Sequence, residues 1–466
     1  MQNVTVVSLF RKRKIFLEEI REISRIFFPL SLAQIMQVSI TLCANLALGG
    51  IGIEALASGG ICNMLIQTGV VIVQSTISSF QSLLGQARGR GGTEGEATAE
   101  RFVACACAVA LGLSAFLVAL LVLIVLVCRA FVFQPSMGQG ALLYMSSAVF
   151  GVPGMVFFSV MRSYGSATGR SASILKAVGC GTLVYGVGAF VVLLLCRGMG
   201  QSILVMMGVV FSIAWSVAAV ISFLTLNILP IFKRSFIQHQ WPAIKSSCAA
   251  ILHAGWPVGL GVASEMSANT MLAMFVGASG VAQMSVHQLC QSIELLTFMP
   301  SLAMSQTVSV RVAYFHGKGE HERSKIVHHV AMVFIFLVAL AEVATILLFH
   351  DPIYRASMSD TGVVSARFDG GLYDMFLVVC AVVVFDGLQA TSSGALRGKL
   401  DMKIPMLMAV TSYWIVGFLF AMVLAHLTPQ PVLGVWIGIC FGVFCSACLQ
   451  TVRFIRINST GRAART

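Results

Sequence analysis

Long apolar runs separated by short polar segments recur along the whole chain. Each run is long enough for a helix to cross the hydrocarbon core of a bilayer, which is about 30 Å thick. The pattern predicts twelve transmembrane helices, so we expect an all-α polytopic membrane protein. The expected spans cover residues 26–48, 58–84, 101–127, 140–162, 172–196, 203–228, 252–276, 282–309, 326–349, 370–395, 404–426 and 432–454.

The positive charges are distributed unevenly between the two sides that these spans define. Of 30 Lys and Arg residues, only Arg129, Arg197, Arg355 and Arg367 fall on the side opposite the termini. Positive residues collect on the cytoplasmic side of membrane proteins, so we expect both termini in the cytoplasm. The net charge of +12 is therefore explained by topology, and we expect no nucleic-acid partner.

Composition agrees with a membrane protein. The chain has 466 residues, 58% hydrophobic and 10% charged, with a mean hydropathy of +0.90. Soluble domains are roughly one quarter charged, which excludes that class. The charged stretch 11–27 leads into an apolar run without a cleavage site, so we expect no signal peptide. The Cys445–Cys448 pair lies inside a span without a second metal-binding pair, and we expect no metal site there.

The chain repeats itself at a spacing of 228 residues. Pro29 and Pro257 have this spacing, and so do the turns Gly89–Gly91 and Gly317–Gly319. Two halves of six spans each are therefore expected to share one orientation, with a site at their interface. The predicted divisions are a cytoplasmic N-terminal segment, an N-lobe, a cytoplasmic linker, a C-lobe and a cytoplasmic tail, at 1–25, 26–228, 229–248, 249–454 and 455–466.

Five acidic residues lie within the expected spans, all in the second half: Glu265, Glu294, Glu342, Asp374 and Asp386. An ionisable residue in a span is costly, which makes each of them a candidate for function. The alternatives are a structural hydrogen-bond acceptor for Glu265 and Asp386, a pairing with a polar partner for Glu294, a helix contact or the outer leaflet for Glu342 and a solvated position for Asp374.

Several motifs, in order and spacing, resemble the MATE (multidrug and toxic compound extrusion) transporters of the bacterial NorM-like branch. The resemblance covers nearly the whole chain, with looser matches in the first half at "PLSLAQIMQ" (29–37), "LGGIGIEALAS" (48–58) and "MRSYGSATGR" (161–170). The segments that carry the resemblance are "GWPVGLGVASE" (255–265), "SVHQLCQSIELLTFMP" (285–300), "VSVRVAYFHGKGE" (308–320), "FDGLQATSSGALRGKLDM" (385–402), "SYWIVG" (412–417) and "GVWIG" (434–438).

The resemblance implies a V-shaped pair of six-helix lobes and an antiporter that exports organic, often cationic or amphipathic, compounds in exchange for Na+ or H+. Glu265 and Asp386 match family positions associated with cation binding, and Glu294 is a third candidate. Na+ at Glu265 and Asp386 is one option and a carried proton is the other. Ala44 stands where relatives often have a first-span carboxylate, and Val382 where some have a tyrosine.

Neutral polar residues in spans are weaker candidates for the substrate cavity. We name Gln37, Asn45, Asn269 and Gln288, for which hydrogen bonding between helices is the alternative. Arg162 lies at an expected span exit and is interpreted as a topological anchor. The expected partners are a small organic substrate, a monovalent cation and the lipid bilayer. We expect a monomer in the bacterial inner membrane that needs no cofactor.

Other functions fit the sequence less well. A flippase for a lipid-linked or glycan intermediate is the main alternative, together with a dedicated natural-product exporter. A carrier of the facilitator superfamily would have an acid in the loop after span 2, which "GQARGRGG" lacks. The chain has no nucleotide-binding loop, HExxH motif or catalytic-triad spacing, so we do not expect an enzyme.

Overall fold

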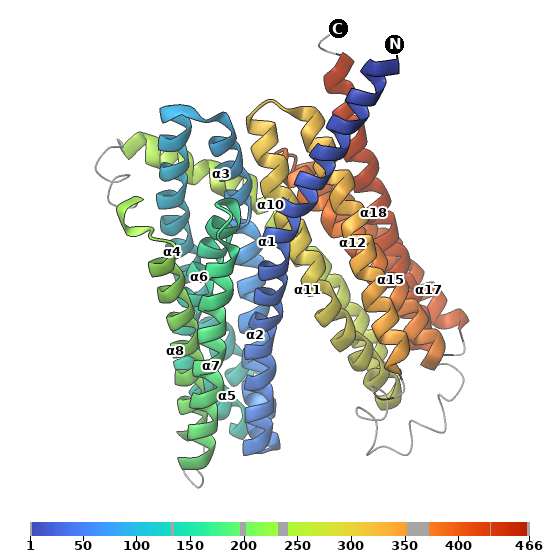
Figure 1. The fold of residues 1–466 in the computed structure, drawn as a ribbon. Helices are drawn as coiled ribbons and strands as arrows, with labels where there is room; N and C mark the ends of the chain where they lie inside the picture. Colours follow the sequence, from blue (N-terminus) through green and yellow to red (C-terminus); the bar gives the residue numbers. More distant parts are fainter. Residues whose placement is uncertain are drawn as a thin grey trace. The chain divides into compact units, whose positions relative to one another are not determined.

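A computed structural model describes residues 2–131, 135–195, 202–231, 241–350, 352, 372–428 and 430–463. Every regular element in this part of the chain is a helix (Figure 1). The elements of the first half are α1 (Gln2–Ile51), α2 (Ile53–Ile77), α3 (Ser79–Arg90), α4 (Gly92–Phe131), α5 (Pro135–Ala148), α6 (Gly151–Ala167), α7 (Ser171–Leu195) and α8 (Ser202–Thr225). Those that follow are α10 (Trp241–Ala278), α11 (Val281–Gly317), α12 (His321–Leu348), α15 (Leu372–Gly398), α16 (Lys403–Val410), the π-helix η1 (Thr411–Phe418), α17 (Leu419–Leu427) and α18 (Pro431–Ala463).

Each of the twelve expected spans falls on one helix or on consecutive helices as far as the described residues extend; residues 196, 370 and 371 at the ends of two spans lie outside them. Within the described residues, ten helices are long and apolar enough to cross a membrane, or eleven if the bent pair α5–α6 forms one span. That pair bends by 46° between Ala148 and Gly151. The expected span 282–309 lies in α11, which is not among these helices because side chains such as Gln283, Gln288 and Glu294 reduce its hydropathy. The chain is thus an all-helical, multi-pass membrane protein.

The expected span 404–426 is not a uniform α-helix. It begins as α16, continues as eight residues of π-helix in η1 and ends as α17. A π-helical segment inside an α-helix shifts the direction of the side chains that follow it, and such segments are frequent at functional sites.

Two compact units make up the chain. Unit 1 contains Met1–Phe27 and Leu260–Thr466, and unit 2 contains Phe28–Gly259. Two long helices are divided between the units: α1 changes unit just before Pro29, and α10 changes unit just after Pro257. A proline inside a helix removes one backbone hydrogen bond, which makes these two points natural places for the helices to bend.

In unit 1, α15 is the central helix and packs along α11, α18 and α12. Val379, Val383 and Trp436 belong to its buried apolar core. The contact between α15 and α11 depends on Gly394, because a side chain there would collide with the carbonyl oxygen of Ser305. Small residues at such crossings allow helix backbones to approach closely within lipid.

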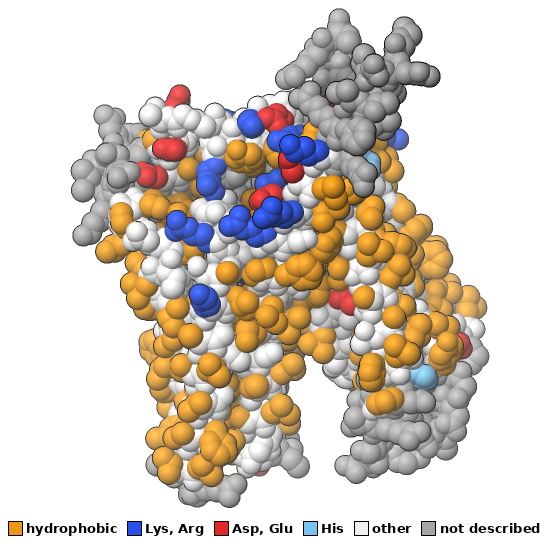
Figure 2. Space-filling view, viewed as in Figure 1, with side chains coloured by type: hydrophobic (Ala, Val, Ile, Leu, Met, Phe, Trp, Pro, Cys, Tyr) orange, Lys and Arg blue, Asp and Glu red, His pale blue; other side chains and the backbone are white. Residues whose placement is uncertain are grey.

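In unit 2, α8 packs against α7, α6 and α5 around a core that includes Tyr144, Phe211 and Trp215. The outer surface is apolar: Phe131 and Leu195 are 85% and 77% exposed. In Figure 2, the visible Lys and Arg side chains of this unit gather mainly toward the end of the bundle where α3 lies. An exposed apolar surface of this extent is a surface for lipid.

Candidate cation-coupling site

Three helices of unit 1 each contribute one acid to a common interior region. Glu265 lies on α10, Glu294 on α11 and Asp386 on α15. Asp386 is buried, with 4% of its surface exposed, whereas Glu265 and Glu294 are half-buried. The charges of Glu265 and Glu294 both act on Asp386, and the charge of Glu265 acts on Glu294. The structure therefore brings together the three acids that the sequence selected.

The position of Asp386 follows from the pattern of α15. Val379, Val382 and Val383 are fully or almost fully buried, and they precede Asp386 by seven, four and three residues. Residues at these spacings lie on one helix face, so the face that packs into the core carries Asp386 with it. The hydrophobic stripe thus forces this carboxyl into the interior.

None of these acids has a basic partner among the described residues. The ion pairs of unit 1 involve other acids, and no Lys or Arg lies within ion-pair distance of Glu265, Glu294 or Asp386. Three neighbouring carboxyls repel one another when ionised, and burial strengthens that repulsion. A bound cation or a bound proton relieves it, which is the chemistry that ion coupling requires.

The π-helix η1 places a hydroxyl group beside this cluster. The buried hydroxyl of Tyr413 lies next to the Glu265 carboxyl, but no described group satisfies it at hydrogen-bond geometry. The adjacent Trp414 donates its ring N–H to the backbone carbonyl of Ser264 at 3.2 Å, which fixes η1 against α10. A free hydroxyl oxygen here is a suitable neutral ligand for a small hard cation. In the sequence, Tyr413 is marked only by its place in the motif "SYWIVG" (412–417).

The cluster is not a tight metal centre. Within the described part of the chain, no three His, Cys, Asp or Glu side chains are grouped closely enough to hold a metal ion. Sodium at Glu265 and Asp386, as the resemblance suggested, would therefore need additional oxygen ligands from hydroxyl or backbone groups. Of the other two candidate acids, Asp374 is exposed at the start of α15, and Glu342 is half-buried on α12.

The neutral candidates are separated between the two units. In unit 1, Asn269 is half-buried and Gln288 is exposed. In unit 2, Asn45 accepts a hydrogen bond from Asn63 at 3.0 Å, and Asn63 in turn accepts one from Tyr144 at 2.7 Å. Asn45 therefore takes part in hydrogen bonding between helices, and substrate contact by it stays a prediction.

Arg162 lies in the interior of unit 2. It is only 6% exposed, and its interpretation as a topological anchor stays a prediction. It donates to Gln34 and Gln37 of α1 at 2.8 Å and to Gln74 of α2 at 3.3 Å. The candidate Gln37 is thus a partner of Arg162. The sequence separates these residues too widely for their meeting to be read from spacing.

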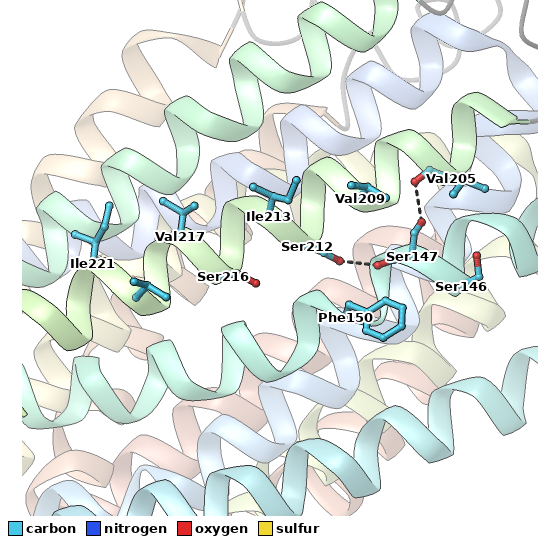
Figure 3. Close-up of a pocket in the computed structure, with 11 residues that line it drawn as sticks. Ser146, Ser147, Phe150, Val205, Val209, Ser212, Ile213, Ser216, Val217 and Ile221 are labelled. Atoms are coloured by element: carbon cyan, nitrogen blue, oxygen red, sulfur yellow. Dashed lines mark hydrogen bonds between the residues drawn. The ribbon is translucent and has the colours of Figure 1, made fainter. Parts of the chain in front are cut away.

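A cavity of about 540 Å3 lies elsewhere in unit 2, between the bend of α5–α6 and α8 (Figure 3). Its wall is mainly aliphatic. The serine hydroxyls in the wall mostly donate hydrogen bonds to backbone carbonyls, as Ser212 does to the carbonyl of Ser147 at 2.6 Å. None of the candidate acids or amides lines it. Phe150 and Val220 at its rim are 72% and 55% exposed, so this cavity opens on the apolar surface of unit 2.

Known proteins resemble the chain along almost its full length. A protein of Synechococcus sp. named "Probable multidrug resistance protein NorM" is 26% identical over 460 residues and covers 94% of both chains. A protein of the same name from Burkholderia mallei is 27% identical and covers 93% of this chain and 92% of its own.

Solved structures show the same fold. The crystal structure of the eukaryotic MATE transporter AtDTX14 matches with a TM-score of 0.82 at 18% identity, over 95% of this chain and 96% of that one. The structure of a transporter of the MOP superfamily from Pyrococcus furiosus also matches with a TM-score of 0.82 at 17% identity, over 95% of this chain and 96% of that one. The sequence profile of the MatE family matches residues 29–192 and 257–423. The chain therefore belongs to the MATE family and is a membrane transporter rather than an enzyme.

Proposed function

We propose that the protein is a secondary active antiporter that exports organic, often cationic or amphipathic, compounds from the cytoplasm in exchange for Na+ or H+. The observation that carries this proposal is the cluster of Glu265, Glu294 and Asp386, three interior carboxyls that lack a basic partner among the described residues. The similarity to relatives named as multidrug resistance proteins also supports the export of organic compounds.

The proposed mechanism uses the cluster as the site of the coupling ion. A cation or proton that binds when the cluster faces outside neutralises part of its charge. A ligand can shift a conformational equilibrium only if it binds the two conformations unequally. Because repulsion among the three carboxyls depends on their separation, a change in helix packing around α15 alters the affinity for the ion. Release to the cytoplasm then resets the transporter.

We further propose a location in the bacterial inner membrane, with both termini in the cytoplasm and a monomer as the working unit. The uneven placement of Lys and Arg supports this orientation, since only four of 30 lie on the opposite side of the expected spans.

Purified protein in proteoliposomes tests the proposal. A fluorescent organic cation is loaded, and an inward Na+ gradient at equal pH is compared with an inward H+ gradient in Na+-free buffer. We expect one gradient to drive dye movement and Asp386→Asn to reduce the response by about fivefold or more. Asp374→Asn is the matched control, because it removes an acid of the same type from the exposed start of the same helix. If neither gradient drives transport, the antiport proposal is wrong.

A further inference from the structure

The interior of unit 2 contains a positive charge without a counter-charge. Arg162 on α6 is held by three glutamine side-chain oxygens, those of Gln34, Gln37 and Gln74. A glutamine oxygen carries only a partial charge, and a guanidinium does not lose its proton in proteins. No carboxylate of the described residues lies within ion-pair distance of Arg162.

The one acid of α2, Glu54, lies in the first turn of that helix, twenty residues before Gln74. A buried charge that lacks a partner is costly, because the protein interior solvates it less well than water does. An ionisable residue at such a position in a membrane protein is by default a candidate for function.

Two hydrogen-bond donors at the same place are also unused. The Nε of Arg162 and the side-chain nitrogen of Gln34 are buried and have no acceptor. Gln34 is 2% exposed and is already joined to Arg162 through its oxygen. Unpaired buried donors are uncommon in folded proteins and each raises the question of what binds there. A carboxylate is the acceptor that suits a guanidinium edge and a neighbouring amide, since it offers two oxygens and a full negative charge.

We propose that Arg162, Gln34 and Gln37 form a binding site for the carboxylate of an exported compound. This inference rests on the proposed export function and names a substrate class for it: organic acids and zwitterions with a carboxylate. Gln37 is half-buried, in contrast to Arg162 and Gln34, and marks the side from which such a group reaches the guanidinium. On arrival, the carboxylate accepts from Arg162 Nε and Gln34 and supplies the missing counter-charge.

Two dyes that differ in one group test the proposal. Rhodamine 110 carries a free carboxylate, and rhodamine 123 is its methyl ester. Binding of each dye to the purified full-length protein is measured by fluorescence polarisation. We expect Arg162→Gln to weaken binding of rhodamine 110 by about tenfold or more, the size expected for a lost charge-assisted contact, and to change binding of rhodamine 123 by less than about twofold.

A second variant keeps the test valid if Arg162→Gln does not fold. Gln34→Glu is nearly isosteric and gives the guanidinium an internal carboxylate, which should exclude the carboxylate dye while leaving the fold intact. The control is Arg170→Gln, which removes the same charge from an exposed position eight residues later and should affect neither dye. If Gln34→Glu leaves rhodamine 110 binding unchanged, or weakens both dyes equally, the proposal is overturned and Arg162 is a structural cross-link.

Replacing chloride by methanesulfonate, a large anion without a carboxylate, separates a substrate carboxylate from a free inorganic anion. We expect rhodamine 110 affinity to stay within about twofold between the two buffers. A strong loss of affinity in chloride that requires Arg162 would mean that the site takes inorganic anions, which also overturns the proposal. Failure of the export function is distinguishable, because wild-type proteoliposomes would then show no gradient-driven movement of rhodamine 123.

Discussion

The two units differ in the acids that their interiors hold. Unit 1 holds Glu265, Glu294 and Asp386 close to one another, and no described Lys or Arg pairs with them. Unit 2 holds Arg162 among neutral glutamines, with Ala44 fully buried at the position where the resemblance led us to look for a carboxylate. Although the sequence repeats at 228 residues, the two halves carry different chemistry. The comparison teaches that the repeat preserves the helices and turns, whereas the buried charged residues differ from one unit to the other.

The largest effect is expected from the acids of unit 1. Glu265→Gln and Asp386→Asn should each reduce ion-driven efflux by about 5- to 150-fold, the range of typical coupling free energies. The double variant should be little worse than either single variant, because groups that act as one site lose their function together. Gradient-driven dye efflux in proteoliposomes measures all three. Additive losses would show that the two acids act at separate sites.

A buried acid that does have a partner sharpens the comparison. Glu19 on α1 is 1% exposed and pairs with Arg311 at 2.5 Å, within unit 1. Glu19→Gln should lower the free energy of unfolding by about 1–3 kcal/mol, because a charged hydrogen bond is lost and the remaining carboxylate contact of Arg311, to Glu22, is 3.9 Å long. Efflux per folded molecule should not change.

Thermal unfolding of the purified protein, together with transport normalised to folded protein, measures both quantities. Glu18→Gln is the control, since Glu18 pairs with Arg323 at 3.4 Å and its side chain is half exposed. Exposed pairs of this kind contribute at most about 1 kcal/mol. If Glu19→Gln abolished coupling without loss of stability, the distinction between paired structural acids and unpaired coupling acids would fail.

A smaller effect is expected from the hydroxyl beside the acids. Tyr413→Phe removes a hydroxyl oxygen that η1 places beside Glu265 and keeps the ring. We expect the ion concentration for half-maximal efflux to rise by about three- to tenfold, as for the loss of one neutral contact. Stability should not fall, because the hydroxyl has no hydrogen-bond acceptor among the described groups. An unchanged ion dependence would remove Tyr413 from the proposed site.

The sequence predicted the helices well because apolar runs and the distribution of Lys and Arg follow directly from the bilayer. It also selected Glu265, Glu294 and Asp386, since an acid in an apolar run stands out locally. It missed Arg162 because the polar character of Gln34, Gln37 and Gln74 indicates nothing until three helices bring them together. A hydropathy pattern indicates which residues are buried, but it does not indicate which side chains they contact.

The same limit applies to η1 and to the pair of Glu19 with Arg311. The change from α-helix to π-helix over Thr411–Phe418 occurs without proline, so no residue signalled it. Glu19 and Arg311 are 292 residues apart and meet only because α1 up to Phe27 belongs to unit 1. Contacts of this separation depend on tertiary packing, which a single sequence does not contain.

The smallest effect is expected where the repeat itself differs, at the turn between α11 and α12. Glu320 occupies the position that corresponds to Gly92 in unit 2, and it pairs with Lys318 at 2.8 Å. The hydrogen bond from Lys318 lowers the pKa of the Glu320 carboxyl, so the folded state prefers the ionised form. The ionised Glu320 carboxyl therefore stabilises the fold at pH values above its pKa in the unfolded chain. This stabilisation is lost below about pH 5, as the pH falls toward the lower pKa that Glu320 has in the folded protein. Glu320→Gln should lower the melting temperature at pH 7 by no more than about 2 °C and leave it unchanged near pH 3.

Glu94→Gln, at an exposed position after the matching turn of unit 2, should show no such pH-dependent difference. A difference that persists at pH 3, or one of equal size for Glu94→Gln, would show that this turn does not distinguish the two units.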